Sequence, residues 1–194
     1  VTVGELPIFV INLERRADRQ QHIRAQLERH GLIGTFVAAV DAQTLDLSAY
    51  PARPLWGRLG SLGNTLSHRA VWRRVIEQSL PAAIVLEDDA SLQDGFCGRL
   101  EQTLAELTFL YDLVYLGSLH DPEVPRITAN LAPAPRAYCT HAYLVSAAGA
   151  VKLLDYVRPI WWPLDNQIAE ESRLIKYLVH PNLANQAGFS SDIA

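Results

Sequence analysis

Short apolar runs and longer amphipathic segments take turns along this chain. A continuous run of apolar, often β-branched residues is typical of a buried strand, whereas apolar residues three or four apart are typical of a helix. We predict strands at residues 7–13, 35–40, 82–86, 112–117 and 142–145, with an edge strand at 126–128. We predict helices at residues 14–31, 62–80, 96–107, 147–157 and 165–177.

Strand and helix alternate over the first two thirds of the chain, which predicts an α/β fold with a mainly parallel central sheet flanked by helices. The helix ends agree with this order. Gly31 and Pro81 stop two helices, and Ser146 is placed to cap a third. Ligands of such sheets bind beyond the carboxyl ends of the strands, and Asn12 and Gly117 both stand at a predicted strand end.

Three segments lack a sustained period and are predicted to be irregular. Residues 41–59 contain Pro51 and Pro54, and a loop of this length inside a compact domain is often functional. Residues 159–163 form a rigid aromatic corner with two tryptophans. The C-terminal stretch from residue 180 is polar, yet Phe189 and Ile193 predict that it folds back onto the body of the protein.

Composition narrows the class of protein. Of 194 residues, 49% are hydrophobic and 20% charged, as in an ordinary globular domain, and the net charge of −4 makes nucleic acid an unsuitable partner. No apolar run reaches the eighteen residues that a membrane span needs. Cys97 and Cys139 are too few for a disulfide framework, so we expect buried free thiols in a reducing compartment.

The candidate chemistry centres on three adjacent carboxylates, Glu87, Asp88 and Asp89, which follow directly after a buried strand. Such acids repel one another, and a divalent cation is a suitable partner for them. Because side chains alternate along an extended chain, Glu87 and Asp89 are expected on one face, with Asp88 on the other. The alternative is an acidic turn in which Asp88 or Asp89 caps the next helix.

Basic residues cluster where the first strand meets its helix. Arg15, Arg16 and Arg19 lie close to a helix N-terminus, which favours anions, so they are candidates to hold a nucleotide phosphate or ribose. The alternative is a solvated helix face, as charged runs usually are. His68, inside the helix at 62–80, is likewise a packed histidine or a site residue.

Two familiar nucleotide-binding motifs are absent. No G-x-G-x-x-G follows the first strand, which argues against a dinucleotide-dependent dehydrogenase or a typical methyltransferase. The chain also contains no Walker A motif, so it is not a P-loop enzyme.

Seven short motifs follow one another along nearly the whole chain. They are Val10 to Leu13 with Arg15, Asp18 and Arg19; Gly60 to His68 with Trp72; Leu86 to Asp89; Ala142 to Ser146; Gly149 with Ala150; Pro163 with Asp165; and Gln186 with Ser191 to Ile193. Taken in this order, the motifs resemble glycosyltransferase family 25, which includes lipooligosaccharide and collagen galactosyltransferases. Each motif alone is weak, but seven in the right order form a strong signal.

The resemblance implies a single domain of the GT-A type, with residues 1–118 binding a nucleotide sugar and residues 119–194 forming the acceptor side and a closing tail. It implies a UDP-sugar donor, first of all UDP-galactose, and Mn²⁺ or Mg²⁺. The reaction would be an inverting transfer that makes a β-linkage to a saccharide or glycolipid acceptor. It also implies a cytoplasmic protein, with peripheral contact to an inner membrane face left open.

Site residues follow from the same resemblance. Glu87 and Asp89 would hold the metal, with the third ligand left between His180, Gln186 and Asp192, of which Asp192 is preferred on charge. Asp165 would be the general base, its alternative being an ordinary helix N-terminal acid. The residues assigned to the nucleotide sugar are Asn12, Arg15, Arg19, Ser61, Asn64, His68, Asp88 and Gly117.

One departure from the family keeps a second function open. Family members usually carry Glu-Ile-Gly-Cys where this chain has Ser61-Leu62-Gly63-Asn64, so a charge is missing from the loop assigned to the donor. The chain is then either a transferase or a catalytically degenerate module that binds a nucleotide sugar or glycan. A Mg²⁺-dependent phosphohydrolase is a weaker third alternative, because the end of the first strand lacks the nucleophilic acid of that class.

Overall fold

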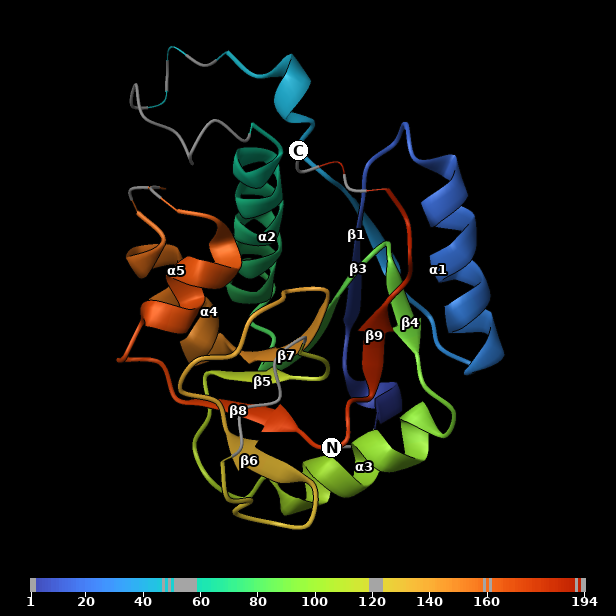
Figure 1. Cartoon of the computed structure of the whole chain (residues 1–194), viewed down its shortest axis with the longest axis vertical. Helices are drawn as coiled ribbons and strands as arrows, with labels where there is room; N and C mark the ends of the chain where they lie inside the picture. Colours follow the sequence, from blue (N-terminus) through green and yellow to red (C-terminus); the bar gives the residue numbers. More distant parts are fainter. Residues whose placement is uncertain are drawn as a thin grey trace.

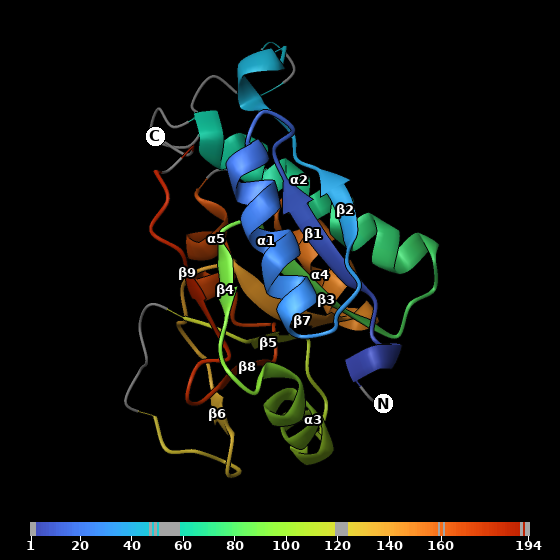
Figure 2. The same ribbon diagram turned by 90° about the vertical axis from the view of Figure 1, so that its right-hand side faces the viewer.

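A computed structural model describes residues 3–46, 48, 50, 59–118, 124–158, 160, 162–190 and 192. A seven-stranded sheet in the order β2-β1-β3-β7-β5-β8-β6 runs through the middle of the molecule. Helices α2, α4 and α5 cover one face, and α1 and α3 cover the other (Figures 1 and 2). The α/β class and the helical layers predicted from the sequence are confirmed.

The N-terminal half supplies one side of the sheet. After a short 3₁₀ turn (η1), β1 pairs in parallel with both β2 and β3, as the alternation of strand and helix predicts. A second 3₁₀ turn (η2) leads toward α2. The bounds are Val3–Glu5 for η1, Ile8–Asn12 for β1, Ala17–Arg29 for α1, Thr35–Ala38 for β2, Ala42–Thr44 for η2, Leu59–Glu77 for α2 and Ala82–Glu87 for β3.

The C-terminal half completes the sheet. β7 runs antiparallel to its neighbours β3 and β5, β8 is parallel to β5, and β6 is antiparallel to β8. Five strands therefore share one direction, and only β7 and β6 among the seven sheet strands reverse it. The bounds are Phe96–Glu106 for α3, Leu113–Tyr115 for β5, Leu131–Pro133 for β6, Ala142–Ser146 for β7, Ala147–Tyr156 for α4, Leu164–Glu170 for α5 and Lys176–Val179 for β8.

Alternation along β3 divides its side chains between two hydrophobic cores. Ala83 and Val85 pack on the α2 side with Val71 and Trp72. Ile84 and Leu86 pack on the α1 side, as do Ile23 and Leu27 of α1. Because the alternation continues to the strand end, Glu87 is directed toward α2 and the next residue toward α1.

Two predicted elements are wrong. The helix expected at 165–177 ends at Glu170, and the following residues include strand β8. The Lys176 ammonium donates to the carbonyl oxygens of Ile168 and Ala169 at 2.7 and 2.9 Å, which satisfies the last helical acceptors and ends α5. The edge strand expected at 126–128 is instead a turn, in which the amides of Ile127 and Thr128 donate to the carbonyl of Leu131 at the start of β6.

A second, two-stranded sheet was not expected from the sequence. β4 (Ala90–Leu92) pairs with β9 (Ala184–Gln186) in antiparallel fashion, directly after the acidic triplet. The C-terminal segment then crosses toward α1, where Phe189 contacts the His22 ring at a centroid distance of 5.2 Å. The prediction that Phe189 folds back onto the body of the protein is confirmed. Predictions were also made for residues outside the described part of the chain, namely Pro51, Pro54, Pro159, Trp161 and Ile193.

Three smaller expectations can be compared with the structure. Ser146 caps α4, since its hydroxyl accepts a hydrogen bond of 3.0 Å from the amide of Gly149. Neither cysteine takes part in a disulfide; Cys139 is buried as expected and Cys97 is only half-buried. Among the described residues, no helix combines the length and apolar character needed to cross a bilayer.

Candidate active site

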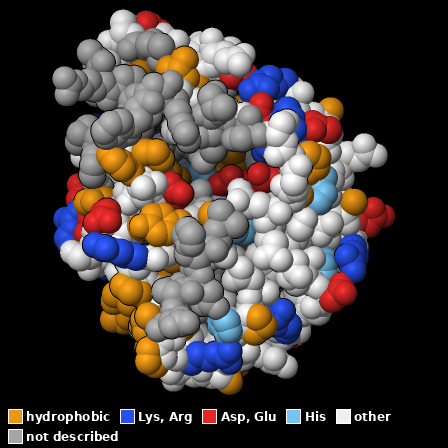
Figure 3. Space-filling view, viewed as in Figure 1, with side chains coloured by type: hydrophobic (Ala, Val, Ile, Leu, Met, Phe, Trp, Pro, Cys, Tyr) orange, Lys and Arg blue, Asp and Glu red, His pale blue; other side chains and the backbone are white. Residues whose placement is uncertain are grey.

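A cavity of about 410 Å³ opens at the carboxyl ends of β1, β2 and β3. Its size is that of a small-molecule site. Figure 3 shows acidic side chains gathered at a hollow near the middle of this face. Seven of the residues assigned from the sequence border the cavity: Arg15, Arg19, Asn64, Glu87, Asp88, Asp89 and Asp192.

Glu87, the last residue of β3, is held from the α2 side of the sheet. Its Oε1 accepts hydrogen bonds from Thr140 Oγ1 at 2.7 Å and from His68 Nε2 at 3.1 Å. Burial alone would raise the pKa of Glu87, but the hydrogen bonds that it accepts from His68 and Thr140 lower it below its ordinary value. Glu87 is therefore an ionised carboxylate whose orientation is set by its neighbours.

Asp88 is turned to the opposite side, toward α1, as the alternation predicts. One of its oxygens accepts from Asn12 Nδ2 at 2.8 Å, and the other pairs with Arg19 Nη1 at 3.0 Å. Both side chains of this ion pair are about 90% buried. Asp88 is thus held by Asn12 and by α1 while it also borders the cavity, and the donor-binding role of both residues stays a prediction.

Asp89 does not share the face of Glu87 in the simple way expected, because β3 ends at Glu87 and residues 88 and 89 form a turn. Its Oδ2 lies 3.4 Å from Arg19 Nη1. Its Oδ1 is buried and has no hydrogen-bond partner. Burial, with further help from the negative charge of Glu87, raises the pKa of Asp89 to about 7.

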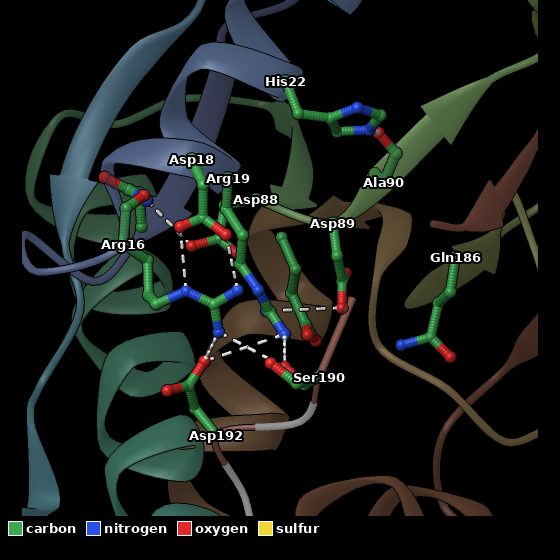
Figure 4. A network of polar contacts seen from close by, with 12 residues as sticks. Arg16, Asp18, Arg19, His22, Asp88, Asp89, Ala90, Gln186, Ser190 and Asp192 are labelled. Carbon is green, nitrogen blue, oxygen red and sulfur yellow. Dashed lines mark hydrogen bonds and ion pairs between the residues drawn. The ribbon is translucent and has the colours of Figure 1, made fainter. Parts of the chain in front are cut away.

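The arginine cluster is occupied by the C-terminal segment. Arg15 Nη1 lies 2.7 Å from Asp192 Oδ1, and Arg16 pairs with the other oxygen of the same carboxylate. Arg19 Nη2 donates to the carbonyl of Ser190 at 2.8 Å. Figure 4 shows Arg16 and Arg19 directed toward Ser190 and Asp192. The alternative of a solvated helix face is therefore wrong for these arginines, because they pair with the C-terminal segment. Their predicted role in binding a phosphate stays a prediction.

Besides Asn12, four assigned residues lie away from the cavity lining. Ser61 is buried in α2 and its hydroxyl has no hydrogen-bond partner. His68 is fully buried and both ring nitrogens are engaged. Gly117 is packed so closely that a Cβ would lie 2.1 Å from the carbonyl oxygen of Ala184. Packing explains this glycine, so a donor-binding role is not needed to account for it.

The fourth is Asp165, in the first turn of α5. Its Oδ1 accepts from the amide of Asn166 at 2.9 Å, as an ordinary helix N-terminal acid does. Burial raises the pKa of Asp165, and the charge of Glu87 raises it further. Asp165 therefore sits within electrostatic reach of Glu87, and its role as a base stays a prediction.

Two residues that support Glu87 were not assigned from the sequence. Thr140 lies in an irregular segment and carries no recognisable signal. Tyr143 belongs to a motif shared with the family, but its pattern is that of a buried strand, so its hydroxyl contact with His68 could not be predicted.

The cation expected from the family can be tested against these side chains. Glu87 and Asp89 both border the cavity, and Asp89 Oδ1 is a buried oxygen with no partner, so the two supply the hard oxygen atoms that Mn²⁺ or Mg²⁺ binds. Asp192 is not grouped with them. Within the described part of the chain, no three His, Cys, Asp or Glu side chains are arranged to hold a metal, and Asp192 is instead paired with arginines. A pair of carboxylates is still sufficient when substrate phosphates complete the coordination.

The protein has an α/β fold, and its cavity opens at the carboxyl ends of the sheet strands, beside an acidic strand end. The chain belongs to glycosyltransferase family 25, since the family model described as "Glycosyltransferase family 25 (LPS biosynthesis protein)" matches residues 5–133.

Curated relatives agree with this assignment. The chain is 34% identical over 203 residues to the "Probable inactive glycosyltransferase 25 family member 3" of Bos taurus, covering 94% of this chain and 33% of the relative. It is 32% identical over 171 residues to "Procollagen galactosyltransferase 2" of Homo sapiens, covering 76% of this chain and 27% of the relative. The chain thus spans about a third of the length of the curated relatives it matches.

Solved structures agree on the fold alone. A glycosyltransferase involved in glycosylation of the major capsid of PBCV-1 superposes with a TM-score of 0.54 at 10% identity, over 96% of this chain and 94% of that one. The protein A197 from STIV superposes with a TM-score of 0.53 at 10% identity, over 96% and 86% of the two chains.

Proposed function

We propose that this chain is a cation-dependent inverting glycosyltransferase that moves a hexose, first of all galactose, from a UDP-sugar to a saccharide or glycolipid acceptor. The observation that carries the proposal is the acidic end of β3. There, Glu87 and Asp89 border a cavity with carboxylate oxygens left for a ligand, in a chain of glycosyltransferase family 25. Galactose is favoured because several relatives are named procollagen galactosyltransferases.

The charge of the cavity supports the need for a cation. Among the described residues, its lining contains two guanidinium groups against five carboxylates, Asp41, Glu87, Asp88, Asp89 and Asp192. A nucleoside diphosphate would add further negative charge to this surface. A divalent cation between the carboxylates and the diphosphate would offset the repulsion, and when bound it would also stabilise the charge that develops on the leaving group.

The residues of the chain then divide the work. Glu87 and Asp89 would hold the cation, and Arg15 and Arg19 would face the phosphates. Asp165 would take the proton from the acceptor hydroxyl, because inversion needs one base on the far side of the anomeric carbon. The raised pKa of Asp165 suits this task, since a general base works best when its pKa lies closer to the operating pH.

The test follows UDP release from UDP-galactose with Mn²⁺ and saccharide acceptors. Glu87→Ala and Asp89→Ala should each lower the rate at least about 100-fold, as the loss of a preorganised electrostatic contact does. Asp94→Ala is the matched control, because Asp94 is an exposed acid close to Asp89 in the sequence that does not border the cavity. Absence of release with every UDP-hexose, or release that ignores both substitutions, would contradict the proposal.

A second function is favoured by a different observation. The 34%-identical relative is named as probably inactive, and Ser61 stands where the family usually has Glu. The hydroxyl of Ser61 is buried without a hydrogen-bond partner, so this position lacks the polar function of the usual residue. A degenerate module would bind UDP in a calorimeter and give no turnover even with acceptors present.

A further inference from the structure

A chain of buried hydrogen bonds leads from the core of the protein to Glu87. Trp72 Nε1 lies 2.9 Å from Tyr143 Oη, and Tyr143 Oη lies 2.8 Å from His68 Nδ1. His68 Nε2 lies 3.1 Å from Glu87 Oε1. Trp72, Tyr143 and His68 are each 0% exposed, and they come from two elements, α2 and β7, that pack on β3.

The donor and acceptor properties of these groups give the row of hydrogen bonds one direction. An indole N–H can only donate, so Tyr143 Oη accepts from Trp72. An ionised Glu87 can only accept, so a neutral His68 ring carries its proton on Nε2 and Tyr143 donates its hydrogen to Nδ1. Nδ1 is then the acceptor nitrogen of the ring, and Nε2 carries the proton that is donated to Glu87. Every hydrogen bond therefore points toward the carboxylate.

The two carboxylate oxygens of Glu87 have different partners. Oε1 accepts from both His68 and Thr140. Among the described residues no donor reaches Oε2, and Glu87 borders the cavity. A carboxylate held in this way at one oxygen cannot turn freely, so its other oxygen keeps a fixed direction toward a ligand.

We propose that Trp72, Tyr143 and His68 are positioning residues, which orient the Glu87 carboxylate for a divalent cation without touching the cation or the substrate. The inference rests on the proposed function, because it needs a cation at Glu87. It assigns His68 a different task from direct binding of the nucleotide sugar. Outer partners of this kind fix the orientation of metal-binding side chains and strengthen them as ligands.

The first measurement reads the hydrogen bonds in the cation-free protein. Nitrogen-15 NMR of histidine-labelled protein should show the His68 ring protonated at Nε2 and unprotonated at Nδ1, with its signals assigned by their loss in His68→Gln. A ring protonated at Nδ1, or at both nitrogens, would overturn the inference whatever the cation does.

The second measurement is the affinity for Mn²⁺ alone, followed by the electron paramagnetic resonance signal of the free ion. Tyr143→Phe removes one hydroxyl and should weaken binding about 10-fold, the lower end of the range for outer partners of metal ligands. Tyr115→Phe is the matched control. Tyr115 is the register partner of Tyr143 on β5, is equally buried, and its hydroxyl has no hydrogen-bond partner. Its variant should bind Mn²⁺ like the unmodified chain.

A pair of His68 variants tests whether the position of the donor to Glu87 matters, rather than its polarity. This pair tests the positioning role even if Tyr143→Phe does not fold. The amide nitrogen of Gln reaches the place of Nε2 and keeps a donor to Glu87, whereas that of Asn reaches only the place of Nδ1. His68→Gln should therefore retain Mn²⁺ binding, and His68→Asn should lose about 10-fold or more.

The outcomes separate the two proposals. Equal Mn²⁺ affinity of Tyr143→Phe and Tyr115→Phe, or of His68→Gln and His68→Asn, with binding still lost in Glu87→Gln, would overturn only the positioning role. An unmodified chain that binds no Mn²⁺, or binding that survives Glu87→Gln, would overturn the cation-dependent function and the positioning role together.

Discussion

Three adjacent carboxylates at the end of β3 avoid mutual repulsion in three different ways. Glu87 stays ionised because His68 and Thr140 donate hydrogen bonds to it. Asp88 is neutralised by the buried guanidinium of Arg19. Asp89 has only a long contact with that guanidinium, and its pKa is raised to about 7. The last carboxylate is therefore the one least satisfied by protein and most open to a cation.

The buried ion pair of Arg19 with Asp88 should contribute measurably to the stability of the protein. Its side chain is 10% exposed, and it pairs with Asp88, which is 7% exposed. Arg19→Gln would leave a buried carboxylate without its counter-charge, which typically lowers the free energy of unfolding by about 3 kcal/mol. We expect a lower urea midpoint with an unchanged slope, measured by circular dichroism.

The matched control is Arg29→Gln, in the last turn of the same helix. Arg29 also pairs with an aspartate, Asp94, but the two side chains are 57% and 86% exposed. Exposed ion pairs contribute little, so this variant should unfold almost like the unmodified protein. If the two substitutions lowered the free energy of unfolding equally, burial would not explain the contribution of the Arg19–Asp88 pair to stability.

At the residue scale, the sequence predicts what depends on local geometry. The opposite directions of Glu87 and Asp88 follow from the alternation of a strand and are confirmed by their partners on α2 and α1. The partners themselves were not predicted. Asp88 and Arg19 are 69 residues apart, and nothing in a single sequence relates their positions. A turn at Asp88 and Asp89 was one of the predicted alternatives, but strand β4 follows it and Gly95 stands at the N-cap of α3, so neither aspartate caps the next helix.

At the scale of elements, strongly periodic segments were predicted within a few residues. The predictions for β1, α1, β3, α3, β7 and α4 rest on apolar spacing and capping residues, which act locally. The errors fall where a long-range contact decides. The residues of β8 continue a helical pattern from α5, but pairing with β5 and β6 and the side chain of Lys176 make them a strand. β4 and β9, three residues each, exist only by pairing with one another.

Lys176 links α5 and β8 and gives this region a dependence on pH. Burial lowers the pKa of Lys176 to about 8 from its ordinary 10.5. Between these values the unfolded chain holds a proton that the folded chain has released, so raising the pH favours the folded state. Relative to Lys176→Met, the unmodified protein should therefore gain stability from about pH 8 to about pH 10.5, by at most about 3 kcal/mol.

Urea unfolding of both proteins at intervals across this range checks the sign. Below about pH 8 the lysine is protonated in both the folded and unfolded chains, so the difference between the two proteins should be flat there. If the difference in the free energy of unfolding stays constant up to pH 10.5, or grows in favour of the methionine variant, then burial does not lower the pKa of Lys176 in the folded protein.

At the scale of the whole molecule, the cavity is assembled from segments that are distant in sequence. The end of β1, the start of α1, residues 39–43, the start of α2, the acidic strand end and the C-terminal segment all border it. The C-terminal segment brings Asp192 onto Arg15 and Arg16, and the proposed function turns the first of these toward the donor phosphates. In this arrangement the protein supplies its own anion to the arginines.

Competition between Asp192 and a diphosphate leads to the last prediction. Asp192→Asn keeps the shape of the side chain and removes one negative charge from a cavity in whose described lining carboxylates outnumber guanidinium groups. UDP should therefore bind more tightly to Asp192→Asn than to the unmodified chain when EDTA removes divalent cations. A single partly exposed charge contributes up to about 1 kcal/mol, so the expected gain is at most about fivefold, and it should shrink as salt is added.

Isothermal titration calorimetry with UDP, in EDTA and in Mn²⁺, separates this role of Asp192 from the one its sequence position suggested. If Asp192 were a cation ligand, Asp192→Asn would weaken UDP binding in Mn²⁺ and leave it unchanged in EDTA. Asp94→Asn provides the control for a charge lost elsewhere on the surface, because Asp94 does not border the cavity. Tighter binding in EDTA by Asp192→Asn alone would place the competing anion on the arginine cluster, where the C-terminal segment meets α1.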